Sequence, residues 1–364
     1  MNKKFSPICK MLLISLLPFF FLSNTYCSKS IKPDTGKEEK RKVIELTLLQ
    51  LNIWVECTKV PNAVQGLIDQ IAGLKPDVAT FCELYKGEGD NPVMPQLIDA
   101  LKKQGLNYYS ARIDGRAIIS KYPIIEQQRI NKWQFKAVLN VEGKRVAVYP
   151  AHSEYRYYTC YYPRGYNDGS KDWNKLNSPI TDVATILKVC SLSGRIESAQ
   201  EFINDAKNEI SKGALVVYAG DFNEPSHLDW QAETANLFDH NGCVINWGVS
   251  SLLYENGFKD AYRETYPDVV KYPGFTFPAN NKDVAPNAIT WTPDADERER
   301  IDFVYYYPDK RLTVKGAALF GPKGYIVRGK RNEDKTKDRV IKPFKDVWPT
   351  DHKGVFITFE INRL

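Results

Sequence analysis

The sequence predicts an α/β protein whose sheets are covered by helices on their outer faces. Eight short apolar runs have the β-branched and aromatic content of strands, and two stretches between them repeat apolar residues at helical spacing. Several strand-like runs follow one another directly, which favours sheets built partly from neighbouring strands. The composition, 43% hydrophobic and 26% charged, is that of a globular protein and excludes a disordered or collagen-like chain.

The individual elements follow from apolar periodicity. Apolar residues spaced three and four apart predict helices over 64–74 and 196–210. The remaining apolar runs are short and rich in valine, isoleucine, tyrosine and phenylalanine, which favours strands. The expected strands, in chain order, are 44–52, 77–82, 116–120, 136–141, 145–152, 214–222, 301–307 and 355–361.

The N-terminus has the pattern of an export signal. Lys3, Lys4 and Lys10 precede an apolar run over 11–23, and small or polar residues follow. This run is shorter than the roughly 20 residues that a spanning helix needs. We therefore expect residues 1–27 to be an export signal and the protein to be periplasmic, secreted or held at the outer surface.

Two alternatives to a cleaved signal remain at this end of the chain. An uncleaved anchor would bring the N-terminus into contact with a membrane. Cys27 offers a site for lipidation after cleavage, but bacterial lipoproteins carry an apolar residue three positions earlier and a small one just before the cysteine. This sequence has Asn24 and Tyr26 there, which weakens the lipid-anchor interpretation.

Residues 28–42 are polar, charged and without apolar period, so we expect a flexible linker. No comparable linker or internal repeat follows, which predicts one domain over 43–364. Residues 1–27 contain three lysines and no acid, so their removal lowers the net charge from +6 to +3. The basic segment 323–345 is interleaved with acids, as in a solvated loop. The charge alone therefore does not favour nucleic acid as a partner.

The cysteines do not predict a structural zinc site. There is no C-x-x-C pair and no histidine at zinc-finger distance from a cysteine. An exported location permits disulfides, but spacing does not determine their pairing. Cys82 lies inside an apolar run, where a buried free thiol is the simpler interpretation.

Polar residues gather at the ends of the predicted strands. A single acid at a strand end is usually a turn former or a helix cap. Five such coincidences favour a site, because α/β folds assemble their sites at strand ends. The residues concerned are Asn52, Glu83, His152, Asp221 with Asn223, and Asp351 with His352.

These residue types suit the hydrolysis of a phosphate ester. The reaction needs oxygen ligands for a hard cation, a base that prepares water, and donors for the phosphoryl and leaving oxygens. The carboxyl and amide groups at the strand ends provide the oxygens. His152 and His352 are two of only four histidines in the chain, and each has a ring nitrogen that can exchange a proton near neutral pH.

Together these residues resemble the endonuclease/exonuclease/phosphatase superfamily, which has the deoxyribonuclease I fold. The resemblance runs from about residue 43 to about residue 361, and GDFN followed later by DH is its most specific part. It implies a four-layer sandwich of two packed mixed β-sheets flanked by helices. The motifs that carry it are LNIW at 51–54, TFCELY at 80–85, GRAIISKYPI at 115–124, YPAHSEY at 149–155, YAGDFNEPSHLDW at 218–230, RIDFVYY at 300–306 and TDHKGV at 350–355.

The resemblance implies a metal site and a cofactor. By position, Glu83 is similar to the family's principal Mg²⁺ ligand, with Asn52 and Asp351 beside the metal. Mn²⁺ is the alternative cofactor. Asp221 would orient the attacking water, and Asn223 would hold a phosphoryl oxygen.

The two histidines also receive roles from the resemblance. His352 would belong to a histidine and aspartate pair, with Asp302 fixing its tautomer. His152 matches a second histidine that donates to a phosphoryl oxygen or the leaving group in some members. A competing interpretation makes Asp302 a surface acid paired with Arg298 or Arg300.

The stretch after His152 is rich in tyrosine and predicts a long loop near the catalytic residues. Arg156 and Arg164 are candidates for a phosphate clamp, and Tyr158 and Trp173 for stacking on a sugar, inositol ring or base. The alternative is that these aromatics pack the loop onto its own domain. Farther along, Trp291 precedes the Asp302 strand and is expected to line the site.

The sequence thus favours a Mg²⁺-dependent enzyme, a phosphodiesterase or phosphatase acting outside the cytoplasm. Its expected substrate is a phosphate ester of a small molecule, a phospholipid or a glycan. A secreted nuclease is the alternative, because nucleic acid would use the same catalytic residues. A binding module with an inactive site is the non-enzymatic alternative. No protein partner is predicted.

Overall fold

A computed structural model describes residues 43–84 and 92–362. The expected export signal, the linker and Cys27 lie outside the described residues. Within the described ranges, no helix combines the length and apolar character that crossing a bilayer requires.

The first sheet has seven strands in the order β14-β11-β15-β1-β2-β4-β3. The central strand β1 pairs antiparallel with β15 and parallel with β2, so the sheet is mixed. Its strands are β1 (Val43–Asn52), β2 (Val78–Cys82), β3 (Tyr109–Ile113), β4 (Arg116–Ser120), β11 (Leu312–Phe320), β14 (Val340–Ile341) and β15 (Gly354–Asn362).

The second sheet has six strands in the order β5-β6-β7-β8-β10-β9. It too is mixed, because β7 and β8 run parallel while β8 and β10 run antiparallel. Its strands are β5 (Ile124–Asn131), β6 (Gln134–Val141), β7 (Lys144–His152), β8 (Leu215–Asp221), β9 (Lys259–Asp260) and β10 (Asp302–Tyr306); a separate hairpin joins β12 (Tyr325–Val327) to β13 (Lys330–Asn332).

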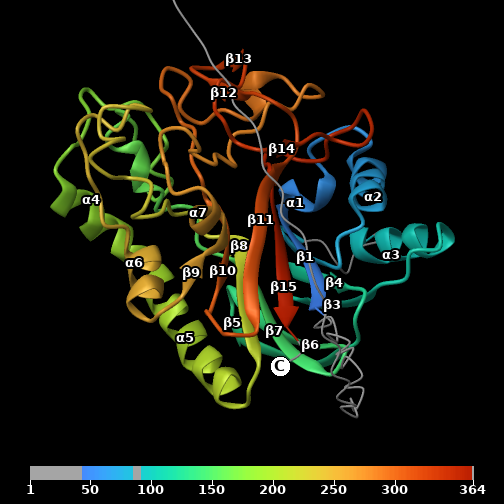
Figure 1. The fold of residues 1–364 in the computed structure, drawn as a ribbon. Helices are drawn as coiled ribbons and strands as arrows, with labels where there is room; N and C mark the ends of the chain where they lie inside the picture. The colour runs from blue at the N-terminus through green and yellow to red at the C-terminus, as the bar shows by residue number, and fades with distance from the viewer. Residues whose placement is uncertain (1–42, 85–91, 363–364) are drawn as a thin grey trace, which may run out of the picture. The chain divides into compact units, whose positions relative to one another are not determined.

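Helices cover the outer faces of both sheets, as Figure 1 shows. The first sheet packs against α2 (Ala63–Leu74) and α3 (Val93–Lys103), and the second against α5 (Arg195–Ser211) and α6 (Gly248–Glu255). This arrangement is the expected four-layer sandwich. The shorter helices are α1 (Trp54–Cys57), α4 (Val183–Cys190), α7 (Ala261–Thr265), η1 (Thr159–Tyr161), η2 (Ser191–Ser193) and η3 (Pro286–Ala288).

The alternation of side chains along a strand explains why the sheets are buried on both faces. In β1, Ile44, Leu46 and Leu48 contribute to the core between the two sheets, whereas Leu49 and Leu51 pack against the helix layer. Successive side chains of a strand point to opposite faces, so both sets can be apolar only if both faces are covered. This is why the inner strands appear in the sequence as nearly continuous apolar runs.

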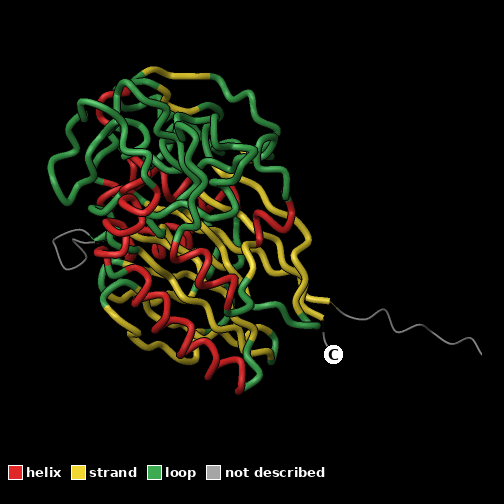
Figure 2. The backbone as a smooth tube through the Cα atoms, turned by 90° about the vertical axis from the view of Figure 1, so that its left-hand side faces the viewer, coloured by secondary structure: helices red, strands yellow, loops and turns green. Residues whose placement is uncertain are grey.

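The structure confirms the eight predicted strands and the two predicted helices, with ends shifted by one or two residues. Edge strand β5 was missed because exposed polar residues interrupt its pattern. Figure 2 shows loops gathered at one end of the strands. Many of these loops are ordered around their own aromatic core, which includes Tyr161, Trp230 and Trp247.

Candidate active site

The candidate catalytic residues continue the inner faces of both sheets. Along β8, for example, Leu215, Val217 and Ala219 fill the core between the sheets, and Asp221 is the next residue on that face. Because side chains alternate strictly, the polar ends of several strands meet at one edge of the core. The pattern that builds the core therefore also assembles the site. In the same way Asn52 ends β1, His152 ends β7 and Asp302 begins β10 on the inner face. Glu83 follows β2, and Asp351 and His352 immediately precede β15, so these residues reach the same edge from the adjoining turns.

Asn52 joins the two sheets at this edge. Its amide nitrogen donates to Glu83 Oε1 at 3.1 Å and to Asp221 Oδ2 at 2.9 Å. Its oxygen accepts the N–H of Trp54 at 2.9 Å. Asn52 thus lies beside Glu83, with its nitrogen rather than its oxygen facing the two carboxyl groups, and its expected place beside a metal stays a prediction.

A left-handed turn holds Glu83. The four residues of α1, Trp54–Cys57, all have φ between 44° and 59°, and Glu83 itself has φ 67°. For residues other than glycine such conformations cost roughly 1–2 kcal/mol each. This turn directs the N–H of Val55 at Glu83 Oε2, to which it donates a hydrogen bond at 2.6 Å. Backbone strain beside a candidate metal ligand is typical of functional sites.

Asp221 and Asn223 are fixed by the turn that ends β8. The N–H of Asn223 donates to Asp221 Oδ1 at 2.9 Å, and the Asn223 side-chain amide donates to the Ser153 carbonyl at 3.1 Å. Asn223 has φ 49°, a region that asparagine tolerates better than most residues. Both side chains line the same pocket.

His352 and Asp302 form the expected pair. His352 Nδ1 lies 2.8 Å from Asp302 Oδ2, and both side chains are buried. Gln50 donates to the other oxygen of Asp302 at 3.4 Å, and the backbone N–H of Asp302 donates to Thr276. Asp302 is therefore not a surface acid paired with an arginine, and the competing interpretation was wrong.

Both imidazoles face the acids of the site. His352 Nε2 lies 3.9 Å from Asp221 Oδ2 and 4.0 Å from Asp351 Oδ1. His152 Nε2 lies 3.8 Å from Glu83 Oε1 and 3.9 Å from Asp221 Oδ2. With Nδ1 bound to Asp302, His352 presents Nε2 to the pocket.

The excess of acid perturbs several protonation equilibria. Burial, followed by the charge of Asp302, raises the pKa of Asp221 to about 6. Burial also raises the pKa of Asp351 to about 7, and the charge of Glu83 contributes in the same direction. Burial alone would lower the pKa of His352, but the charge and hydrogen bond of Asp302, with the charges of Asp351 and Asp221, raise it to about 10.

The donor set fits a hard divalent cation. Glu83 and Asp351 line one pocket, and the charge of Glu83 raises the pKa of Asp351, as two acids do when they lack a shared counter-ion. Among the described residues, two sets of ligand atoms lie within 4.8 Å of one another: Cys82 with His152 and Asp221, and Asp221 with Asp302 and His352. The Cys82 set would suit a softer metal than Mg²⁺.

The pocket beside these residues has a volume of about 900 Å³. This is within the range of small-molecule sites. Arg156, Tyr158, Trp173 and Trp291 line it, and the roles expected for them in substrate binding stay predictions. Arg156 is held by Glu154, which accepts from its Nε and Nη2 at 2.9 Å each.

Arg164 is not part of this pocket, and its expected role as a phosphate clamp was wrong. The guanidinium is buried, lies 2.8 Å from the carboxylate of Glu299, and donates to the carbonyls of Cys160 and Asp296. These partners tie the tyrosine-rich loop to the segment before β10. The alternative that this loop packs on its own domain therefore holds for Arg164.

Sequence reasoning missed several residues that contribute to the site. Trp54, Lys59 and Trp133 line the pocket. Gln50 could have been found, because it lies two residues before Asn52 on the same face of β1. Trp133 had no such signal, since it lies in the turn between β5 and β6, far in sequence from any motif.

The described cysteines do not form disulfides. Cys57, Cys82, Cys160, Cys190 and Cys243 are all buried free thiols. This confirms the interpretation of Cys82. Burial raises the pKa of Cys82 well above its usual value, so the thiol stays protonated beside the acids of the site.

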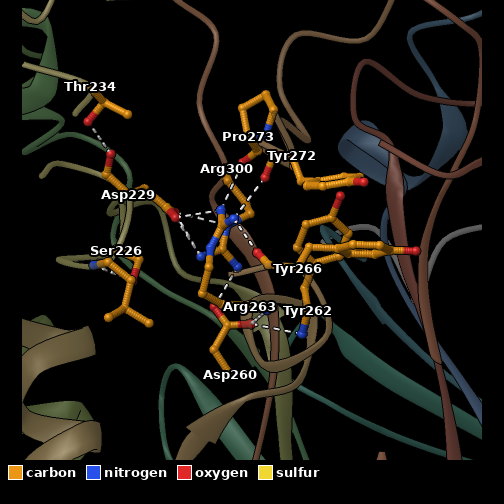
Figure 3. Close-up of polar contacts among 12 residues, drawn as sticks. Ser226, Asp229, Thr234, Asp260, Tyr262, Arg263, Tyr266, Tyr272, Pro273 and Arg300 are labelled. Carbon is orange, nitrogen blue, oxygen red and sulfur yellow. Dashed lines mark hydrogen bonds and ion pairs between the residues drawn. The ribbon is translucent and has the colours of Figure 1, made fainter. Parts of the chain in front are cut away.

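A second buried charge cluster lies next to the site and is shown in Figure 3. Arg300, two residues before the start of β10, pairs with Asp229 at 2.8 Å and with Asp260 at 2.5 Å. Arg263 pairs with Asp229 at 2.7 Å and donates to the carbonyls of Tyr266 and Tyr272. Two arginines thus balance two aspartates.

Comparison with known proteins places the chain among proteins with this architecture. The model of the Endonuclease/Exonuclease/phosphatase family matches residues 49–352. An uncharacterized protein of Caenorhabditis elegans, F14F9.5, is 26% identical over 359 residues, which cover 96% of this chain and 99% of the relative.

Similar solved structures are more distant in sequence. The human Nocturnin catalytic domain, with bound sulfate, is 14% identical, with a TM-score of 0.48 and coverage of 88% of this chain and 97% of that one. TDP2 of D. rerio, complexed with a single-strand DNA product, is 18% identical, with a TM-score of 0.47 and coverage of 86% and 98%.

Proposed function

Since this chain belongs to the endonuclease/exonuclease/phosphatase family, we propose that it is a Mg²⁺-dependent hydrolase of small phosphate esters. Members of the family are divalent-metal-dependent hydrolases of phosphoester bonds. The observation that carries the proposal is the convergence of Glu83, Asp221, Asp351 and the His352 and Asp302 pair on one pocket. We assign Mg²⁺ as the metal because the carboxylate ligands are hard oxygen donors.

Glu83 and Asp351 would hold the cation, with Asn52 orienting the Glu83 carboxylate. When bound there, Mg²⁺ would neutralise charge on the phosphoryl group and polarise its oxygens. Burial, and then the charge of Glu83, raises the pKa of Asp351, and a cation bound between the two acids would offset both effects.

The protein's own residues supply the proton transfers. Asp221 is suited to orient and deprotonate the attacking water, because its pKa of about 6 lies closer to neutral pH than that of an ordinary aspartate. His352 is protonated at neutral pH and offers Nε2–H to a phosphoryl or leaving oxygen. His152, at the end of β7 in the six-stranded sheet, faces Glu83 and Asp221 and can donate to a second oxygen. Asn223 adds an amide to the same pocket.

We further propose that the enzyme acts outside the cytoplasm. The support is the charged and apolar pattern of residues 1–27, which resembles an export signal. The substrate would be a phosphodiester or phosphomonoester of a small molecule, a phospholipid or a glycan. The modest net charge favours these over duplex DNA, which demands a strongly basic groove.

The test is a substrate panel measured with Mg²⁺ and with excess chelator. We would use the chain from Ser28 onward with bis-p-nitrophenyl phosphate, p-nitrophenyl phosphate, phospholipids and plasmid DNA. Metal-dependent cleavage of small esters or lipids with intact plasmid supports the proposal. Nicked plasmid would favour the nuclease alternative, and turnover that persists in chelator would contradict the metal-dependent mechanism.

A further inference from the structure

An aromatic wall adjoins the catalytic residues inside the same pocket. Trp173 and Trp291 come from segments more than 100 residues apart, yet their ring centroids lie 5.0 Å apart at an angle of 46°. Tyr161 packs its edge against Trp173 at 5.9 Å. All three line the pocket with His152, Asp221 and His352.

The fold holds Trp173 in a strained conformation that brings its indole into this wall. Its φ is 60°, which is rare for a bulky residue. Gly169 leaves the space that the ring needs, because a Cβ at that position would lie 2.0 Å from the indole. Asp168 fixes the turn, since its side chain accepts from Tyr162 at 2.9 Å and from the N–H of Ser170 at 2.9 Å.

A buried acid joins the two sides of the wall. Glu297 accepts the hydroxyl of Tyr161 at 2.9 Å and the backbone N–H of Trp291 at 3.0 Å. Arg164 connects the same two segments through Asp296 and Glu299. The rings are therefore held in position before any ligand binds, which lowers the ordering cost of binding.

Trp291 is not a core residue despite these restraints. Its side chain is 48% exposed, although exposing a tryptophan sacrifices much of its hydrophobic stabilisation. Stability alone does not explain why a strained Trp173 and an exposed Trp291 are held together in the lining of this pocket.

We propose that Trp173 and Trp291 form a subsite for a sugar or cyclitol ring carried by the phosphate ester. The two indoles touch, so no slot separates them for a flat base. The two indoles, inclined by 46°, offer an apolar surface that is not flat, which suits the C–H bonds of a puckered ring. The ring hydroxyls would face the polar rim formed by Glu154 and Arg156. This proposal rests on the proposed function, because the subsite positions the ester that the catalytic residues cleave.

Binding can be measured separately from turnover. In a His352→Asn background with Mg²⁺, the affinities of inositol 1-phosphate, glucose 1-phosphate, glycerol 3-phosphate and thymidine 5′-monophosphate would be compared by calorimetry. Stacking of one ring on an aromatic side chain changes affinity by about 5- to 30-fold. We expect the inositol and glucose phosphates to bind about tenfold more tightly than the glycerol and thymidine phosphates.

Three substitutions test whether the two indoles cause this preference for ring-bearing phosphates. Trp291→Leu and Trp173→Leu should each remove most of the roughly tenfold ring preference without weakening glycerol 3-phosphate binding. Gly169→Ala should act like Trp173→Leu, because it displaces the indole. Phe344→Leu is the matched control, since Phe344 is 46% exposed and lies outside the pocket lining.

The outcomes separate this subsite from the proposed function. Tryptophan-dependent ring binding in a protein that cleaves no ester would support the subsite and contradict the function. Cleavage of glycerol and ring esters with equal KM, unchanged by Trp291→Leu, would support the function and overturn the subsite. Tighter binding of thymidine phosphate than of both sugar and cyclitol phosphates would also overturn it, in favour of a base-stacking surface.

Discussion

Arg300 and Asp302 are two residues apart in the sequence but belong to charge clusters of opposite kinds. Arg300 and Arg263 balance Asp229 and Asp260 in a buried ion-pair network (Figure 3). Asp302 belongs to the site cluster, defined as Glu83, Asp221, Asp302, Asp351, His152 and His352, in which four carboxyl groups face two imidazoles.

The difference shows how charge balance separates structural from functional clusters. In the Arg300 network each charge is paired, so the network holds β10 and α7 in place and has no need of a ligand. In the site cluster burial, followed by the charges of neighbouring acids, raises the pKa of Asp221 and Asp351, and a bound cation would balance these acids. Removing an arginine from the Arg300 network and removing an excess acid from the site cluster should therefore have opposite effects on stability.

The largest expected effect is the loss of activity when the site imidazole is removed. In His352→Asn the new amide can still donate to Asp302, so the hydrogen bond at Nδ1 is kept while Nε2 is lost. We expect turnover to fall by about 10²- to 10⁴-fold, and the melting temperature to fall as well because the buried Asp302 loses its imidazolium partner. Steady-state kinetics and thermal unfolding test this prediction, and wild-type turnover would remove His352 from the mechanism.

Breaking the balanced cluster should cost stability. Arg300→Met leaves the buried Asp260 without its arginine partner. We expect unfolding free energy to fall by about 3–5 kcal/mol in urea titrations. Lys175→Met is the control, because Lys175 and its partner Asp294 are both exposed and such pairs contribute roughly 0–1 kcal/mol. Equal losses in both variants would show that the buried Arg300 network stabilises the fold no more than an exposed ion pair does.

Neutralising an acid of the site should instead increase stability. The pKa of Asp351 is raised to about 7 when folded, against about 4 when unfolded, so the folded state binds more protons between these values. Stability of the metal-free protein should therefore decrease as pH rises from about 4 to about 7. At pH 7.5 without metal, the free energy of unfolding of Asp351→Asn should be about 2–4 kcal/mol higher than that of the wild type.

The control for Asp351→Asn is the same comparison of stability with the wild type at low pH. At pH 4 the wild-type carboxyl is protonated, so Asp351→Asn and wild type should have nearly the same stability. Thermal unfolding at both pH values in chelator measures the difference. A destabilised Asp351→Asn protein at pH 7.5 would mean that the site acids are already balanced.

The fold and the location of the site were predictable because both depend on alternation within strands. Apolar runs identify the strands, and a polar residue at the end of a run, such as Asn52 or His152, marks where the inner faces emerge. The ordered motifs then indicated the family. These signals are local in sequence, so they are visible without coordinates.

The partners of the charged loop residues were not predictable. Arg156 and Arg164 are eight residues apart in the same tyrosine-rich loop, but one lines the pocket and the other is buried against Glu299. Arg156 is held by the nearby Glu154, whereas the burial of Arg164 depends on contacts with a segment more than 130 residues later in the chain. The left-handed turn at Trp54–Cys57 was equally hidden, since these residues have no glycine or asparagine to indicate positive φ.

The central claim is that Glu83 and its neighbouring acids form a cation site that the Arg300 network does not provide. Calorimetric titration of Mg²⁺ into chelator-stripped protein tests it most directly, with Asp294→Asn as a control that removes an exposed acid. We expect wild type and the control to bind Mg²⁺ and Glu83→Gln to lose that binding by at least about tenfold. Equal Mg²⁺ binding by all three proteins would contradict the assignment of the site.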